Sequence, residues 1–237
     1  MDKRLFGKEI HIPLNGLNVS RRLEYNLLMR YLDLKGTESL LDVACGDGFW
    51  TAKMLSQAAS VVGFDYNFKR LRQAGNLASG MLGRIRNDAH VLPFADEKFD
   101  ASVGICVLEH FQDDVKALSE LRRVTKPGGK LALTVDSFSY PGISEAEKEK
   151  HAKKFSVVHL YKIETLTEKL KQAGYEVLQW TYLLRTPISA NLYLQALRHP
   201  KLAYFVYPIT YPLSLWSEQQ SKNQECGHKL AVLARAV

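Results

Sequence analysis

The sequence predicts an α/β protein built on a doubly wound parallel sheet, and three observations support this. Apolar segments of strand length alternate with amphipathic helical patterns along most of the 237 residues. One segment, 101–107, is continuously apolar, as is typical of a central parallel strand buried on both faces. A Gly-x-Gly turn, Gly46-Asp47-Gly48, separates the first strand from the next helix. We therefore expect helices on both faces of the sheet.

The first half of the chain accounts for four strands. Ser20 is a candidate cap for an opening helix that Gly36 ends. A short helix should run through Met54 to Ala58, and a longer one from Tyr66 or Asn67 to Gly80. The strands are expected at 39–44, 61–65, 84–87 and 101–107.

The second half completes the pattern. Asp113 or Asp114 caps a helix that ends near Val124, and Pro127-Gly128-Gly129 turns the chain into the next strand. A further helix ends at Gly174. Strands are expected at 131–135, 175–184 and 228–236.

Two long connections lie outside this scheme, within what we expect to be one domain over 1–237. Segment 137–161 is longer than such connections usually are, and it follows the strand at 131–135. Because ligands of open α/β sheets lie at the carboxyl ends of strands, this segment is expected to form a lid. Segment 186–227 precedes the last strand and is rich in aromatic residues.

Composition narrows the function. The formal net charge is +7, but the charges are dispersed, and acidic residues interrupt the densest basic segment, 148–154, so no nucleic-acid partner is expected. Met1-Asp2-Lys3-Arg4 leads into no apolar stretch of signal-peptide length. Cys45, Cys106 and Cys226 have no metal-ligand spacing. We expect a cytoplasmic protein with reduced thiols and no bound metal.

The glycine turn and a distant carboxylate predict an adenosine-containing cofactor. Asp65 ends the second strand 19 positions after Gly46, which is the spacing at which α/β proteins bind a ribose. Thr51 stands where a dinucleotide fingerprint needs a third small residue, which disfavours a nicotinamide cofactor. No Gly-Lys-Ser/Thr follows the glycines, so a P-loop is excluded.

Four segments resemble class I S-adenosylmethionine (SAM)-dependent methyltransferases, of the small-molecule, methyltransferase type 11-like group. Asp42-Val43-Ala44-Cys45-Gly46-Asp47-Gly48 is similar to the first motif of that family, Asp/Glu-x-Gly-x-Gly-x-Gly, with Ala44 in place of the first glycine. The other similar segments are 87–94, 99–110 and 126–133. The resemblance covers about residues 20–185. It implies a Rossmann-like sheet of seven strands with the last antiparallel, and SAM as the cofactor.

The resemblance also implies roles for individual residues. Asp65 would bind the ribose, Asp88 the adenine amino group, and the Ala89 N–H an adenine ring nitrogen. Arg21 and Arg22 on the first helix are candidates for the methionine carboxylate, since a guanidinium suits a carboxylate. The cofactor-binding residues are expected to be Asp42, Ala44, Cys45, Gly46, Asp47, Gly48, Asp65, Tyr66, Asp88, Ala89, Cys106 and Arg22.

Methyl transfer is an in-line displacement that depends mainly on positioning, although a hydroxyl acceptor needs a general base. His110 is the candidate base, because it follows the central strand at the expected cofactor edge; its alternative is a pocket-wall residue that bonds to backbone. Glu109 is a candidate partner for it. His159 and Tyr161 are further candidates, with packing or capping as their alternative roles.

The function predicted is methyl transfer from SAM to a small-molecule or lipid-like acceptor. The alternatives are an RNA or protein methyltransferase, an NAD(P)-dependent oxidoreductase, or a protein that binds the cofactor without catalysis. Segment 107–110 lacks the Asn/Asp-Pro-Pro-Tyr/Phe tetrapeptide that many amino-directed enzymes carry.

Segment 202–216 is aromatic-rich, but it is too short and too interrupted by Pro208 and Pro212 to span a bilayer. It remains open whether it covers the substrate, forms a dimer contact, docks on a membrane as a peripheral surface, or folds onto its own domain. The oligomeric state and the acceptor atom are not predicted.

Overall fold

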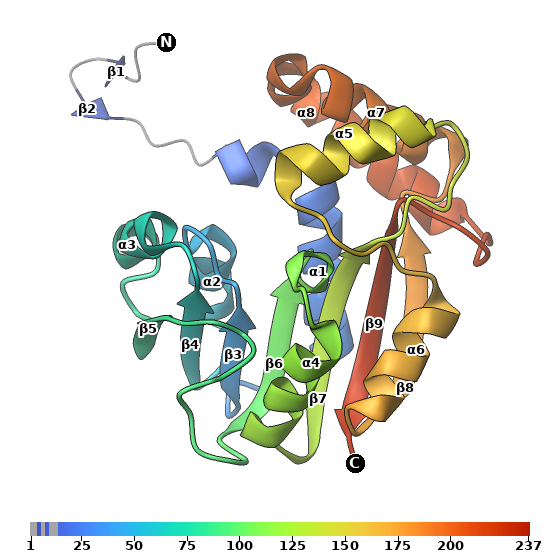
Figure 1. Ribbon diagram of the computed structural model, residues 1–237. Helices are drawn as coiled ribbons and strands as arrows, with labels where there is room; N and C mark the ends of the chain where they lie inside the picture. Colours follow the sequence, from blue (N-terminus) through green and yellow to red (C-terminus); the bar gives the residue numbers. More distant parts are fainter. Residues whose placement is uncertain (1–3, 6–7, 10–13) are drawn as a thin grey trace.

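The protein is built around a seven-stranded sheet with the order β5-β4-β3-β6-β7-β9-β8 (Figure 1). The structure, a computed structural model, describes residues 4–5, 8–9 and 14–237, so Met1-Asp2-Lys3 of the opening segment lie outside the described residues. The strands are β3 (Ser39–Val43), β4 (Ser60–Asp65), β5 (Gly83–Arg86), β6 (Phe99–Ile105), β7 (Thr125–Asp136), β8 (Tyr175–Leu183) and β9 (Lys229–Ala236). The last strand, β9, is antiparallel to both neighbours, which confirms the predicted architecture. A separate pair of short antiparallel strands, β1 (Arg4–Leu5) and β2 (Lys8–Glu9), precedes the seven-stranded sheet in the chain.

Two neighbouring strands, β3 and β6, are each followed by a residue with left-handed backbone. β3 and β6 pair in parallel, and Ala44 and Cys106 follow them with φ of +53° and +51°. The left-handed backbone conformation is strained for a residue that has a Cβ, and it is not the extended conformation of a strand, so a strand rarely continues through such a residue. β6 therefore ends at Ile105, earlier than the predicted 101–107, and both backbones turn away at the same sheet edge.

The core lies in two clusters on opposite faces of the sheet, as predicted. One cluster packs α4 (Asp114–Val124) and α6 (Ile163–Gln172) on the sheet, and the other packs α1 (Val19–Leu32) and α7 (Pro187–Arg198). Leu41 belongs to the first cluster and Leu40 to the second, because successive strand residues point to opposite faces.

Capping residues account for the helix starts. Asn18, not Ser20, caps α1, because the Asn18 side chain accepts from the Arg21 N–H, while Ser20 lies inside the helix and donates to Glu24. Asn67 caps α3 (Phe68–Leu77) and Asp113 caps α4, each being one of the two residues predicted. The remaining short helices are η1 (Leu14–Leu17), α2 (Phe49–Met54) and η2 (Leu108–His110).

Both long connections fold into helices beside the carboxyl ends of the parallel strands (Figure 1). Segment 137–161 contains α5 (Glu145–Phe155), which begins with a capping box between Ser144 and Glu147. Segment 186–227 contains α7 and α8 (Pro200–Gln220), and α8 continues through both internal prolines. Among the described residues, no helix is long and apolar enough to cross a bilayer.

Candidate active site

A cavity of about 550 Å³ lies at the carboxyl ends of β3, β4, β6 and β7, and its volume is typical of small-molecule sites. The residues at one end come from β3, β4 and the turn that follows β3: Asp42, Ala44, Cys45, Gly46, Asp47 and Asp65. Those at the other end come from β7, β9, η2, α5 and the residue that follows β6: Cys106, Glu109, His110, Asp136, His151 and Lys229. The cavity therefore extends along the sheet edge from the predicted cofactor turn to the long connections.

The turn after β3 depends on its glycines for two different reasons. Gly46 has φ of +59° and open space around an added Cβ, so conformation alone favours glycine there. At Gly48 (φ +77°) a Cβ would also lie 2.8 Å from the Cβ of Ala74 on α3. Glycine at position 48 thus allows α2 to begin against α3, with its N–H groups facing the turn.

Asp65 holds this turn and also faces the cavity. One carboxylate oxygen accepts from the Gly46 N–H at 2.9 Å, and the other accepts from the Asn67 N–H at 2.7 Å. A carboxylate has about four lone-pair sites, so about two remain for hydroxyl donors from the cavity. The free acceptor sites of Asp65 and the space at this end of the cavity therefore fit the hydroxyl groups of the ribose of SAM.

Asp42 and Thr51 form a buried pair behind the turn. The Thr51 hydroxyl donates to the Asp42 carboxylate, and both side chains are almost inaccessible. Burial, assisted by nearby Asp65, raises the pKa of Asp42 to about 7 although the Thr51 bond acts in the opposite direction. Thr51 therefore supplies a hydrogen-bond donor to the buried Asp42 carboxyl group. A dinucleotide site would need a small residue at position 51 instead.

Several predicted cofactor residues do not line the cavity. Tyr66 is 71% exposed beside Arg86, Ala89 lies in the core, and Gly48 is not in the lining. Asp88 pairs with His90. The proposed contacts of these residues with SAM stay predictions.

The structure places Arg21, not Arg22, at the cavity. The Arg22 guanidinium lies over the Tyr211 ring, 5.8 Å from its centroid, whereas Arg21 lines the cavity and donates to the Ile105 carbonyl at 3.0 Å. Consecutive helical residues point about 100° apart, so only one of the two can face the site.

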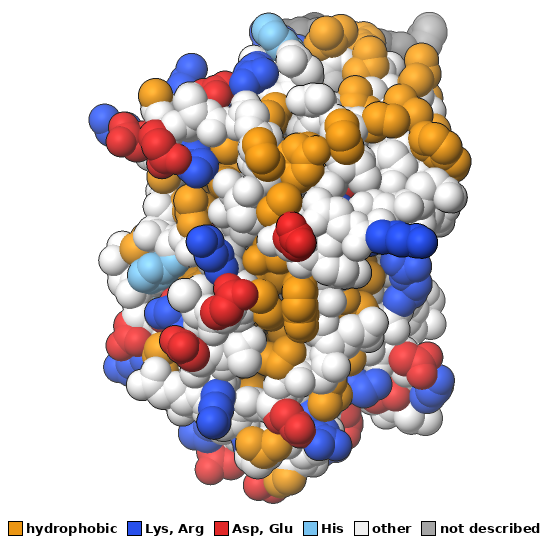
Figure 2. All heavy atoms as spheres, turned by 90° about the vertical axis from the view of Figure 1, so that its right-hand side faces the viewer, with side chains coloured by type: hydrophobic (Ala, Val, Ile, Leu, Met, Phe, Trp, Pro, Cys, Tyr) orange, Lys and Arg blue, Asp and Glu red, His pale blue; other side chains and the backbone are white. Residues whose placement is uncertain are grey.

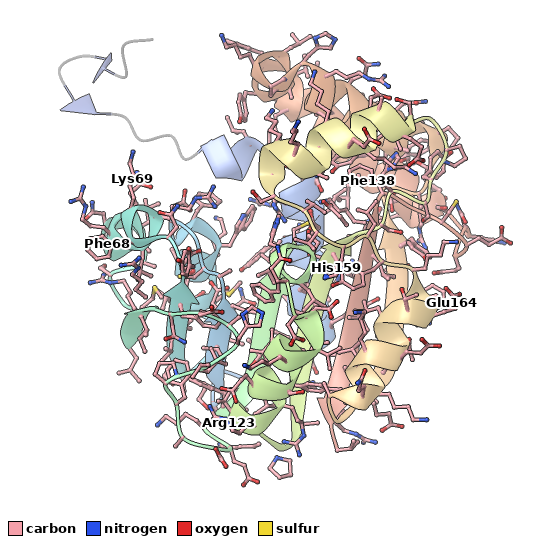
Figure 3. All side chains as sticks on the ribbon, viewed as in Figure 1. Phe68, Lys69, Arg123, Phe138, His159 and Glu164 are labelled. Atoms are coloured by element: carbon pink, nitrogen blue, oxygen red, sulfur yellow. The ribbon has the colours of Figure 1, made fainter. Side chains whose placement is uncertain are left out.

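His110 lines the cavity, and its Nδ1 lies 3.2 Å from the Ser156 carbonyl oxygen, as in its alternative prediction. Burial lowers its pKa. The other two candidates lie outside the lining. Tyr161 donates to Asp114 at 2.6 Å, and His159, labelled in Figure 3, lies with its Nε2 3.4 Å from the Gln112 carbonyl oxygen. Their observed roles are structural.

The sequence analysis missed a buried charged cluster at the far end of the cavity. The Lys229 ammonium contacts the Asp136 carboxylate and lies 2.8 Å from Cys106 Sγ. Burial alone would lower the pKa of Lys229, but the charges of nearby Asp136, Cys106, Tyr193 and Glu24 together raise that pKa above its ordinary value. The available signals were an acid that ends β7 and a lysine that begins the otherwise apolar β9.

Glu109 adjoins this cluster with unpaired carboxyl oxygens. Its side chain is fully buried, and neither oxygen has a hydrogen-bond partner in the described part of the chain. Burial and the nearby Asp136 raise its pKa to about 8, so the carboxyl is mainly protonated at neutral pH. Its backbone carbonyl accepts from Val158 and thereby joins η2 to the end of segment 137–161.

Three possible metal ligands, from Cys106, Glu109 and Asp136, lie within 4.8 Å of one another. The Lys229 ammonium contacts two of these residues. It therefore already supplies a positive charge at this place, and the absence of a metal stays a prediction.

The sheet order, the antiparallel β9 and the cavity at the strand ends define a Rossmann-like protein of the class I methyltransferase type. Residues 41–133 match the family model described as "Methyltransferase domain". This matched segment, 41–133, is therefore that of a class I SAM-dependent methyltransferase domain.

Curated relatives and a solved structure agree with this family. The chain is 41% identical over 112 residues to a demethylmenaquinone methyltransferase of Corynebacterium kroppenstedtii, covering 47% of each protein. The one from Corynebacterium urealyticum is 37% identical over 145 residues, covering 60% of this chain and 62% of that protein. The chain thus spans about half the length of the first of these relatives. The geranyl diphosphate C-methyltransferase from Streptomyces coelicolor shares the fold with a TM-score of 0.69 and 14% identity, covering 92% of this chain and 78% of that one.

Proposed function

We propose that the protein transfers a methyl group from SAM to a small-molecule acceptor. The observation that carries this proposal is the cavity that begins at the Gly46–Gly48 turn and Asp65, within a domain of this family. Asp65 would bind the ribose, the turn backbone the amino-acid part, and Arg21 its carboxylate. Bound SAM supplies an electrophilic methyl group, and the protein positions the acceptor and excludes water.

The two long connections support the second part of this proposal. Segment 137–161 contributes His151 and Phe155 to the cavity, and segment 186–227 contributes Tyr193 and Leu197. We propose that both segments close over the acceptor, as insertions in a single methyltransferase domain over 1–237.

We propose a lipid-like acceptor at this end of the cavity. Its walls include Phe155 and Leu197, while Asp136 and Lys229 form a polar region deeper in the fold. The relatives are named for demethylmenaquinone, which joins a polar quinone head to an apolar chain. We propose an acceptor of this kind, with its polar head at the buried charges.

Calorimetry and a transfer assay test the function. We expect S-adenosylhomocysteine to bind and NADH not to bind. With radiolabelled SAM, label should pass to reduced demethylmenaquinone. If S-adenosylhomocysteine binds but a panel of quinols, phenols and amines takes up no label, a binding protein without catalysis is favoured. Tight NADH binding would favour the oxidoreductase.

The exposed face of α8 supports a membrane contact for the lipid-like acceptor. Leu202, Phe205, Ile209, Leu213 and Trp216 recur at spacings of three and four, and we call them the α8 stripe; they are 39–78% exposed. Figure 2 shows hydrophobic side chains gathered on the upper part of one face of the molecule, at the level where α7 and α8 lie in Figure 1. Such a stripe of large apolar side chains is typical of an interaction surface.

The charges near α8 favour a lipid surface, rather than a second copy of the chain, as the partner of the α8 stripe. Lys201 and Lys222 are exposed at the two ends of α8, and Glu218, the helix's acidic residue, is buried. Positive charge beside an apolar helix face is attracted to anionic lipids, and it would oppose an identical face. We propose that the α8 stripe docks on the membrane that contains the acceptor.

Vesicle flotation tests the stripe. Phe205→Ser together with Ile209→Ser should weaken binding to vesicles that contain phosphatidylglycerol by ~30-fold, since about 2 kcal/mol of apolar burial is lost. The control is Leu82→Ser with Leu178→Ser, which removes exposed apolar side chains outside α8. Equal flotation of wild type and stripe variant would contradict the proposal, and a concentration-dependent dimer that this variant abolishes would favour the second copy instead.

A further inference from the structure

A histidine–aspartate pair that no sequence motif marks lies at the acceptor end of the cavity. His151 on α5 places its Nε2 3.0 Å from Asp136 Oδ2, at the end of β7. Both residues line the cavity. The other oxygen of Asp136 contacts the Lys229 ammonium, so both carboxylate oxygens are held.

The pair determines which imidazole nitrogen can accept a proton. Burial by itself would raise the pKa of Asp136. The Lys229 charge and the hydrogen bonds from His151 and Lys229 outweigh burial and keep this pKa low, so the Asp136 carboxylate is ionised. An ionised carboxylate only accepts hydrogen bonds, and His151 must therefore present Nε2–H to it. In the neutral ring the lone pair is then on Nδ1.

Packing keeps the ring in this orientation. Its centroid lies 4.9 Å from that of Phe138 and 4.7 Å from that of Phe155, and Figure 3 shows Phe138 below α5. The His151 side chain is only 11% exposed. Nδ1 has no hydrogen-bond partner within the described ranges, so it is available to a molecule in the cavity.

We propose that His151, oriented by Asp136, is the general base that takes a hydroxyl proton from the acceptor, and that the acceptor is an aromatic alcohol or hydroquinone. This inference rests on the proposed function and adds the acceptor class and the catalytic residue. Asp136 is a positioning residue. His110 also lines the cavity, but a backbone carbonyl, rather than a carboxylate, orients it.

The charges at this end favour a neutral hydroxyl compound over an amine. Lys229 and Asp136 neutralise each other, and Glu109 is mainly protonated at neutral pH. No unpaired negative charge therefore remains among these groups to attract an ammonium ion. A neutral amine also attacks through its own lone pair, whereas a hydroxyl becomes a strong nucleophile only as its proton is removed.

The proton and electron balance follows. The acceptor O–H proton moves to His151 Nδ1, and the resulting imidazolium is stabilised by Asp136. The electron pair left on the acceptor forms a new bond to the methyl carbon, from oxygen or from the conjugated ring carbon. The carbon–sulfur bond of SAM breaks with both electrons remaining on sulfur. After attack by carbon, the ring C–H proton is lost and the hydroxyl is restored, so one proton is released in either case.

The test compares wild type with His151→Gln, which keeps a polar side chain without a basic nitrogen. We expect turnover of reduced demethylmenaquinone to fall by ~10²–10⁴-fold. The affinity for S-adenosylhomocysteine should stay within about twofold, because His151 lies at the acceptor end. His199→Gln is the control, since His199 is exposed between α7 and α8, away from the cavity lining.

A second measurement does not depend on turnover. In the presence of sinefungin, a SAM analogue with an amine in place of the sulfonium, p-nitrophenol bound to wild type should ionise about one pH unit below the free phenol. His151→Gln should lose this shift, and His199→Gln should keep it. The colour of the phenolate reports the result directly.

The outcomes separate this inference from the proposed function. If neither S-adenosylhomocysteine nor sinefungin binds wild type, the proposed function fails. If they bind but His151→Gln keeps wild-type turnover, or keeps the phenol shift, the inference is overturned and the function stands. Methylation of an amine, with no binding of p-nitrophenol to wild type, also overturns it.

Discussion

Replacing Asp65 with alanine is expected to weaken the binding of S-adenosylhomocysteine by about 5- to 150-fold. The carboxylate at the end of β4 is nearly buried and lines the cavity. Its loss would leave two ribose hydroxyls without an acceptor, and unsatisfied groups of this kind cost about 1–3 kcal/mol. The Gly46 N–H would also lose its partner, which would loosen the turn that we propose binds the amino-acid part of SAM.

Calorimetric titration measures the effect, with a thermal melt to verify that the variant is folded. The control is Asp33→Asn, because Asp33 is an exposed acid with left-handed backbone that asparagine also tolerates. An unchanged dissociation constant for Asp65→Ala would remove Asp65 from the cofactor site. A large loss in the control would show instead that the assay reports general damage.

The largest effect on stability is expected for Lys229→Met, which should lower the free energy of unfolding by about 3–5 kcal/mol. The substitution leaves the Asp136 carboxylate buried without its main cationic partner. The double variant Lys229→Met with Asp136→Asn should recover much of this loss, because it removes both charges. The cost thus comes from the stranded charge rather than from a large net gain by the pair.

Urea denaturation of the single and double variants gives the coupling energy. Arg235→Met is the matched control: Arg235 lies on the same strand and pairs with Glu176, but both side chains are about half exposed. An exposed pair of this type contributes less than about 1 kcal/mol. If Lys229→Met lowered the free energy of unfolding no more than Arg235→Met does, the buried pair of Lys229 and Asp136 would not be important for stability.

Local patterns were sufficient for the alternation of strands and helices and for the turn and carboxylate at one end of the cavity. Alternating strand and helix signals are encoded in neighbouring residues, and the predicted strand positions differ from those observed mainly at their ends. The turn at Gly46–Gly48 and the spacing to Asp65 are similarly local, because a strand, a turn, a helix and the next strand occupy consecutive residues. The resemblance to a known family supplied the antiparallel last strand, which periodicity cannot show.

The sequence alone therefore determined the individual strands, the glycine turn and the acid that holds it, since each depends on residues close together in the chain. Only the tertiary structure decided the other end of the cavity, where we propose that the acceptor binds. Asp136, His151 and Lys229 come from β7, α5 and β9, and they meet because β9 inserts beside β7 and α5 folds over the strand ends. The choice of Arg21 over Arg22 also required the structure, because it depends on how α1 is rotated against the sheet.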